Sequence, residues 1–211
     1  MAEPERTAAP IRLARRAEFD RLIAIENDAE AALVEVGVPL PADYPTLSHA
    51  ALARALAARL LFVATDGADR PLGFVAARRC RDALLIVELD VERRRQGRGT
   101  GRALMEHVLA EGRRRGLGGA MLTTDRLAPF NRAFYASLGF VELDAPSVPP
   151  PLAAVLAREI ALGLDPARRI AMALRFAHPA SLTPPRAPRR SPAADHSRRR
   201  RDAGPPRPGP R

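Results

Sequence analysis

A glycine- and arginine-rich segment between an apolar run and an amphipathic helix constrains the fold of this chain more than any other feature. The apolar run spans residues 83–91, the segment Glu-Arg-Arg-Arg-Gln-Gly-Arg-Gly-Thr-Gly spans 92–101, and the helical pattern covers 101–115. Glycines allow backbone N–H groups to turn toward an anion. A helix that begins at the same place adds the positive end of its dipole. The segment therefore predicts a strand–loop–helix unit that binds a diphosphate.

Two common phosphate-binding motifs do not fit this segment. A P-loop requires a Gly-Lys-Ser/Thr ending, and the chain contains no lysine. A Rossmann fingerprint requires G-x-G-x-x-G directly after the strand, whereas Gly97, Gly99 and Gly101 have the spacing G-x-G-x-G and are separated from Val91 by residues 92–96. The segment instead has the pattern V-x-x-x-x-Q-x-x-G-x-G, with Gln96 at the glutamine position.

A second motif lies downstream, where residues 131–140 have the sequence N-R-A-F-Y-A-S-L-G-F. Together, and in this order, the two motifs resemble the pyrophosphate loop and the N-x-x-x-Y-x-x-x-G-F block of the GNAT superfamily of acyl-CoA N-acyltransferases. The resemblance covers roughly residues 10–143. Residues 163–172 are more loosely similar to the ending of a bacterial subgroup of the superfamily whose substrates are largely unassigned.

The resemblance implies an α/β GNAT fold, with a mixed, mostly antiparallel sheet of six to seven strands flanked by about four to five helices. Apolar periodicity places the same elements along the chain. Strands are predicted near residues 11–14, 61–65, 72–77, 83–91, 120–124, 140–143 and 169–176, and helices near 16–35, 48–60, 101–115, 129–138 and 150–162. We therefore expect one GNAT domain over residues 10–176.

The resemblance also implies acetyl-CoA as the cosubstrate. It assigns the pyrophosphate to the backbone N–H groups of the loop, the pantetheine arm to the end of the preceding strand, and a further contact to the asparagine of the second motif. The cofactor-binding residues predicted in this way are Leu89, Asp90, Val91, Gln96, Gly97, Arg98, Gly99, Thr100, Gly101, Arg102 and Asn131. A tight turn with solvated arginines is the alternative for the loop, and an ordinary polar residue at a helix start is the alternative for Asn131.

Two residues are candidates for catalysis. By resemblance, Tyr135 protonates the departing CoA thiolate, and a phenol with a pKa near 10 can donate that proton. Glu88 lies within an otherwise apolar strand, where burial would raise its pKa, and we favour it as the base that deprotonates the amine. The alternatives are an aromatic packing role for Tyr135 and a solvated or salt-bridged acid at Glu88. The superfamily varies at the base position, so the resemblance does not decide it.

The positive charge is concentrated at the C-terminus. Residues 177–211 contain nine arginines, two aspartates and nine prolines, which leaves a net charge of +3 for residues 1–176. Such a segment cannot bury enough apolar surface to offset its ordering entropy, so we predict that residues 177–211 are disordered, as are residues 1–9. A solvated extension is favoured over nucleic-acid binding for this tail, although arginine clusters do bind phosphates.

The remaining features favour a cytoplasmic bacterial enzyme. The single Cys80 excludes an intrachain disulfide, no apolar run is long enough to span a membrane, and the four histidines have no metal-ligand spacing. The leading hypothesis is transfer of an acetyl group to a primary amine of a small molecule or peptide by direct attack in a ternary complex, with a homodimer left open. Acids near the first two helices could attract this amine: Glu26, Asp28, Glu30 and Asp43. The alternative is a CoA-binding module without turnover whose basic tail binds nucleic acid or a partner protein.

Overall fold

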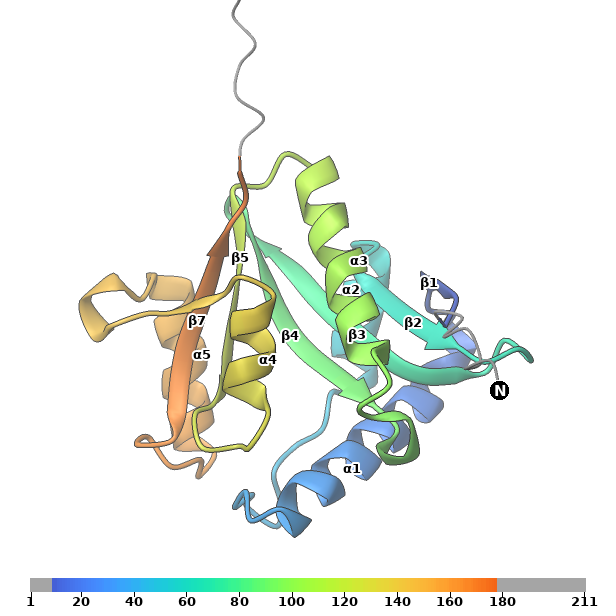
Figure 1. The fold of residues 1–211 in the computed structure, drawn as a ribbon, viewed down its shortest axis with the longest axis horizontal. Coiled ribbons are helices and arrows are strands. Elements are labelled where there is room, and N and C mark those ends of the chain that lie inside the picture. Colours follow the sequence, from blue (N-terminus) through green and yellow to red (C-terminus); the bar gives the residue numbers. More distant parts are fainter. Residues whose placement is uncertain (1–8, 178–211) are drawn as a thin grey trace, which may run out of the picture. The chain divides into compact units, whose positions relative to one another are not determined.

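The computed structural model describes residues 9–177, which form a seven-stranded open sheet with five α-helices (Figure 1). The elements are β1 (Ile11–Leu13), η1 (Arg16–Glu18), α1 (Phe19–Glu35), α2 (His49–Ala57), β2 (Leu61–Thr65), β3 (Pro71–Cys80), β4 (Ala83–Val91), η2 (Arg93–Arg95), α3 (Thr100–Arg114), β5 (Gly119–Asp125), α4 (Asn131–Ser137), β6 (Val141–Glu142), η3 (Ala145–Ser147), α5 (Pro150–Ala161) and β7 (Arg169–Arg175). The predictions of disorder for 1–8 and 178–211 lie outside the described residues.

The sheet has the strand order β1-β2-β3-β4-β5-β7-β6. Every neighbouring pair is antiparallel except β4 and β5, which run parallel. This arrangement confirms the prediction of a mixed, mostly antiparallel α/β sheet. The parallel pair lies at the centre of the sheet, and α3 makes the crossover between its two strands.

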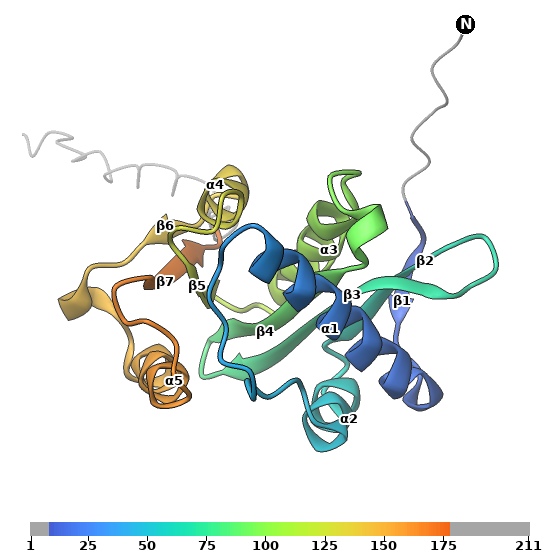
Figure 2. The same ribbon diagram turned by 90° about the horizontal axis from the view of Figure 1, so that it is seen from below.

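Helices cover both faces of the sheet (Figure 2). On one face, α3 buries Leu104 and Val108 in the largest core cluster, and α4 packs at the edge of this cluster. On the other face, α1 and α2 bury Leu22 and Leu52 against β2 and β3, and α5 buries Leu152 against β4, β5 and β7. Each apolar stripe predicted from the sequence thus packs against a face of the sheet.

Short-range chemistry explains where the elements begin and end. The Ser48 side chain accepts a hydrogen bond from the N–H of Ala51 (3.2 Å) and so caps α2. In the β2–β3 hairpin, the Asp66 carboxylate accepts the N–H groups of Ala68 (3.0 Å) and Arg70 (2.9 Å). Past the C-terminal end of α3, Gly116 has a φ of +69°, which is the left-handed conformation that ends helices.

Two predicted boundaries differ from the structure by three residues, and the other differences are smaller. Strand β3 continues three residues past the predicted Ala77, because Arg79 still pairs with Leu84 of β4 while its side chain stays in solvent. Helix α2 ends at Ala57 rather than near Leu60, because Arg59 adopts a φ of +55° that breaks the helix. Both differences depend on backbone geometry that apolar periodicity does not encode.

We expect removal of residues 178–211 to change the melting temperature by less than about 2 °C. The three core clusters of the described residues draw their side chains from residues 9–176, so the shortened chain keeps all of them. Thermal melts of the full and shortened chains, followed by circular dichroism, measure this. Loss of a cooperative melt would place part of the domain beyond residue 177.

Candidate active site

Strands β4 and β5 separate in the middle of the sheet, and we call the interval between their backbones the gap. The two strands pair only where Ala83–Leu85 meets Gly119–Met121, and both then diverge, as Figure 1 shows. A β-bulge contributes to this divergence, since Val87 falls between two registers of the β3–β4 ladder and has no partner there. Beyond the bulge, Glu88, Leu89, Asp90 and Val91 pair with β3 on one side and border the gap on the other.

The glycine-rich loop leads from β4 into α3 with its backbone N–H groups free. Gly97 and Gly99 have φ values of +70° and +88°, a conformation that favours glycine. Within residues 9–177, the N–H groups of residues 97–102 have no hydrogen-bond acceptor, and the first helical bond of α3 runs from Ala103 N–H to Gly99 O (3.0 Å). No heavy atom lies within 4 Å of an ideal Cβ built on Gly97 or Gly99. These groups are therefore available to an anion from solvent.

Gln96 has a different position from the rest of the loop. Its side-chain Nε2 donates to the carbonyl oxygen of Val91 (3.1 Å), and its backbone N–H donates to Arg93 O (3.2 Å). Gln96 thus braces the loop against the end of β4, and the free N–H groups begin at Gly97. Among the loop arginines, Arg102 donates to Ser137 Oγ of α4 (2.5 Å).

Helix α1 is attached to the start of this loop. The N–H of Arg93 donates to Asp28 Oδ2 (2.8 Å), and the Arg93 side chain forms an ion pair with Glu35. Glu92 is 4% exposed and pairs with Arg21 of α1 and with Arg94. Asp28, which the sequence offered as an acceptor-site acid, therefore holds the loop instead.

Helix α4 brings Asn131 and Tyr135 to the same side of the sheet as the loop. An ideal Cβ on Gly101 would lie 3.7 Å from Val91 Cγ2 and 3.9 Å from a ring carbon of Phe134, so loop, β4 and α4 meet there. The Tyr135 ring packs edge-on against Phe134 and Phe140. Burial, and then the charges of Glu88 and Asp90, raise the pKa of the Tyr135 hydroxyl above its usual range. Asn131 is half-buried at the first position of α4.

Four acids from α1 and β4 meet on the opposite face of the sheet. Glu26 is 3% exposed, and the N–H of Leu47 donates to its two carboxylate oxygens (2.9 and 3.1 Å). Burial, followed by the charges of Glu26 and Glu30, raises the pKa of Glu88 to about 8. Burial and the same acids raise the pKa of Asp90, whose Oδ2 is buried with no hydrogen-bond partner among the described residues. Burial and the proximity of the other acids thus favour the protonated forms of Glu88 and Asp90.

The far wall of the gap carries a polar network that the sequence interpretation missed. Arg169 of β7 donates to Glu159 Oε1 (2.9 Å) and to Thr123 Oγ1 (3.1 Å), and Thr123 donates to Glu159 (2.7 Å). The charge of Arg169 lowers the pKa of Tyr44, whereas burial is the larger effect and raises it to about 12. Arg169, within residues 163–172, and Glu159, on the preceding helix, are the signals in the sequence that could have revealed this wall.

The described residues contain no group of three or more His, Cys, Asp or Glu side chains placed to hold a metal ion. The search for membrane spans likewise found no helix in them that is long and apolar enough to cross a bilayer.

Comparison with known families agrees with this arrangement. Residues 57–142, from the end of α2 to β6, match the family model of the acetyltransferase (GNAT) domain. Residues 57–142 thus carry a GNAT acetyltransferase domain. The matched residues of this GNAT domain include β4, the glycine-rich loop and α4, and they leave α1 and the connection to α2 outside.

Solved structures share the fold of the GNAT domain. The ribosomal-protein-S18-alanine N-acetyltransferase from Escherichia coli is 22% identical, with a TM-score of 0.57 over 81% of this chain and 97% of that one. The PaiA N-acetyltransferase from Thermoplasma acidophilum, solved in complex with coenzyme A, is 13% identical, with a TM-score of 0.63 over 81% of this chain and 100% of that one. Ard1 from Thermoplasma volcanium is 17% identical, with a TM-score of 0.60 over 82% and 100%.

Proposed function

We propose that the GNAT domain is an N-acetyltransferase that moves an acetyl group from acetyl-CoA to a primary amine by direct attack in a ternary complex. The gap between β4 and β5 carries this proposal. It lies between the face with the free loop N–H groups and Tyr135 and the face with the acidic cluster. Two substrates that enter from opposite faces would meet in it.

The first face fits coenzyme A. The N–H groups of residues 97–102 and the start of α3 suit a pyrophosphate, and Arg98 and Arg102 add positive charge beside them. The unpaired edge of β4 from Leu89 to Val91 suits the amide groups of a pantetheine arm, in the way that a peptide adds to a sheet. The PaiA structure with coenzyme A supports this assignment for the fold. Asn131, at the start of α4, completes the proposed set.

The second face fits a cationic amine. Glu26, Glu30, Glu88 and Asp90 lie together. Burial is the main cause of their raised pKa values, and repulsion between the acids, which a cation would relieve, adds to it for Glu26, Glu88 and Asp90. An ammonium group would also satisfy the unpartnered Asp90 Oδ2. The acceptor is thus a small molecule or peptide with a primary amine. We expect the reaction in the cytoplasm, as the cysteine usage of the sequence suggests.

The residues of the gap can then manage the protons of acyl transfer. Bound acetyl-CoA would supply the thioester carbonyl. Glu88 accepts a proton from the acceptor ammonium, which frees the nitrogen lone pair for attack on the carbonyl carbon. Once the C–N bond has formed, Tyr135, whose raised pKa keeps its hydroxyl protonated, donates its own proton to sulfur as the C–S bond breaks. The second proton of the newly bonded nitrogen then restores the Tyr135 hydroxyl, and Glu88 releases its proton to solvent. Cys80, at the far end of β3, has no part in this route.

A thiol-release assay with acetyl-CoA and a panel of amines tests the function. The panel contains polyamines, aminoglycosides, free amino acids and peptides with an unblocked N-terminus, and mass spectrometry identifies the acetylated product. Thiol release that depends on one amine class supports the proposal. Tight CoA binding without release for any amine would support the alternative of a binding module.

We expect Tyr135→Phe to lower kcat by about 10- to 1,000-fold, with little change in affinity for acetyl-CoA. The variant keeps the ring that packs against Phe134 and Phe140 and removes only the proton donor. Steady-state kinetics give kcat, and calorimetry gives the affinity. A near-normal kcat would assign the proton to water or to another residue.

A further inference from the structure

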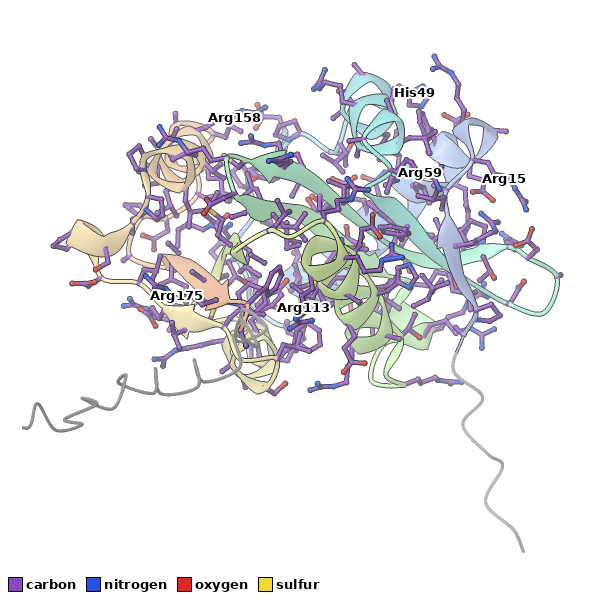
Figure 3. All side chains as sticks on the ribbon, turned by 90° about the horizontal axis from the view of Figure 1, so that it is seen from above. Arg15, His49, Arg59, Arg113, Arg158 and Arg175 are labelled. Carbon is purple, nitrogen blue, oxygen red and sulfur yellow. The ribbon has the colours of Figure 1, made fainter. Side chains whose placement is uncertain are left out.

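A cluster of exposed arginines lies at the end of the sheet opposite the glycine-rich loop. The segments that meet there are the α2–β2 turn, the β3–β4 hairpin, the C-terminal end of α3 and the end of β7. We call their exposed arginines the basic face: Arg59, Arg78, Arg79, Arg81, Arg113, Arg114, Arg115 and Arg175. Figure 3 labels three of them, Arg59, Arg113 and Arg175, which come from three different segments.

Hydrogen bonds hold these segments side by side. Arg115 donates from its guanidinium to the carbonyl oxygens of Ala58 and Arg59 (both 2.9 Å), which ties α3 to the α2–β2 turn. Cys80 pairs with Ala83 in the β3–β4 hairpin, and Gly119 of β5 pairs with Ala83 on one side and with Arg175 on the other. The basic face is therefore built on the rigid end of the sheet.

The other segments at this end add little negative charge. The basic face holds eight of the 24 arginines of residues 9–177 but only two of their 20 acids, Asp82 and Glu111. Glu111 is already paired with Arg114 and Arg115. The rest of the domain carries more acids than arginines. Surfaces of soluble domains usually intersperse both signs, so this segregation favours a polyanionic ligand.

Several of these guanidinium groups are free to bind. Within residues 9–177, the side chains of Arg59, Arg78, Arg81 and Arg175 make no hydrogen bond or ion pair. Arg113 stacks over the Phe176 ring at 4.6 Å, which orients it without neutralising it. A guanidinium presents a planar fork of donors that matches phosphate oxygens.

We propose that the basic face is a docking site for the phosphate backbone of a nucleic acid, and that it works in addition to any contribution from the arginines of residues 177–211. The exposed large apolar side chains of the described residues all lie on other segments, among them α1, the β5–α4 connection and α5. An interface with a protein partner usually has an apolar centre, whereas nucleic-acid interfaces are polar and positively charged. The face thus fits phosphates better than an acidic protein.

The location separates this site from the gap. Strand β4 spans nine residues from the basic face to the glycine-rich loop, or about 25 Å at the usual rise per residue. A nucleic acid bound there would leave the gap open. A nucleic acid at the basic face would therefore anchor the protein without blocking the gap. Binding at this face does not depend on whether the domain transfers acetyl groups.

Fluorescence anisotropy with a labelled 20-base-pair RNA duplex, using the full chain, tests the proposal. The face variant combines Arg78→Gln, Arg81→Gln and Arg175→Gln. A matched control variant, with Arg16→Gln, Arg70→Gln and Arg158→Gln, loses the same charge from exposed positions elsewhere. We expect the face variant to bind at least about tenfold more weakly and to reduce the slope of log K against log salt by about 2 to 3, and the control to match the unmodified chain.

Several results would overturn the proposal. Equal losses in both variants would mean that net charge alone attracts the duplex, and full binding by the face variant would assign it to residues 177–211. Absence of binding at 50 mM salt would remove the site altogether. Anionic vesicles or polyglutamate that bind more tightly than the duplex, and lose that binding in the face variant, would assign the face to a membrane or an acidic protein. Melting curves of both variants confirm that each is folded.

Discussion

Glu88→Gln lowers kcat by about 10²- to 10⁴-fold and removes the rise of kcat/KM with pH, if Glu88 is the base that deprotonates the acceptor. The pKa of Glu88 is raised to about 8 by burial and by the neighbouring acids. A base acts in its deprotonated form, so the active fraction is about a tenth at pH 7 and increases as the pH rises through 8. Measurements of kcat/KM between pH 6 and pH 10 follow this increase, the rising limb of the pH profile.

Glu30→Gln is the matched control for this prediction. Its carboxylate is one of the charges that raise the pKa of Glu88, and the side chain is only half-buried on α1. Removing the charge lowers the pKa of Glu88, so the rising limb moves to lower pH while the plateau of kcat remains. An unchanged limb in Glu88→Gln would exclude Glu88 as the base, and water would take that role.

Gly99→Val raises the dissociation constant of acetyl-CoA by about 10- to 100-fold, which corresponds to the cost of about 1–3 kcal/mol for forcing a branched residue into this conformation. Gly99 has a φ of +88°, and open space surrounds the position of its Cβ. The loss of affinity therefore comes from a change in the backbone. The loop relieves the strain at residue 99 by rotating, and the neighbouring N–H groups then no longer point toward the same pyrophosphate. Isothermal calorimetry measures the affinity.

Gly116→Val provides a control with the same kind of strain. Gly116 has a φ of +69° and nothing within 4 Å of its Cβ position, but it follows the C-terminal end of α3. The control loses stability and keeps its affinity for acetyl-CoA. If both variants bound acetyl-CoA as the unmodified chain does, the loop between β4 and α3 would not be the pyrophosphate site.

The sequence predicted every strand and helix of the described domain, because each carries an apolar stripe that a sheet face must cover. It failed where backbone geometry decides the outcome. Periodicity did not predict the left-handed Arg59 that ends α2, or the bulge at Val87. The mixed order of the sheet came from the family resemblance, since local patterns carry no information on which strands pair.

For the candidate site, the motifs located the loop and α4, whereas the roles of single side chains needed the structure. Gln96 belongs to the loop motif, yet its side chain bonds to Val91. Asp28 is an exposed acid on α1 that holds the N–H of Arg93. Arg169 reaches the gap only because β7 inserts beside β5, more than 40 residues later in the chain. The net charge of residues 1–176 likewise did not indicate that exposed arginines cluster at one end of the sheet.

The separation of β4 from β5 is a property of the backbone, in which a bulge at Val87 precedes the divergence of the two strands. Substitutions in the lining of the gap therefore alter its chemistry and leave its opening intact. The family match spans residues 57–142, which include β4, β5 and the loop, and it does not include α1 or the connection that follows it. Exchange of residues 37–48 alone keeps the contacts of Arg21, Asp28 and Glu35 with the loop, so it tests whether this connection sets the substrate preference.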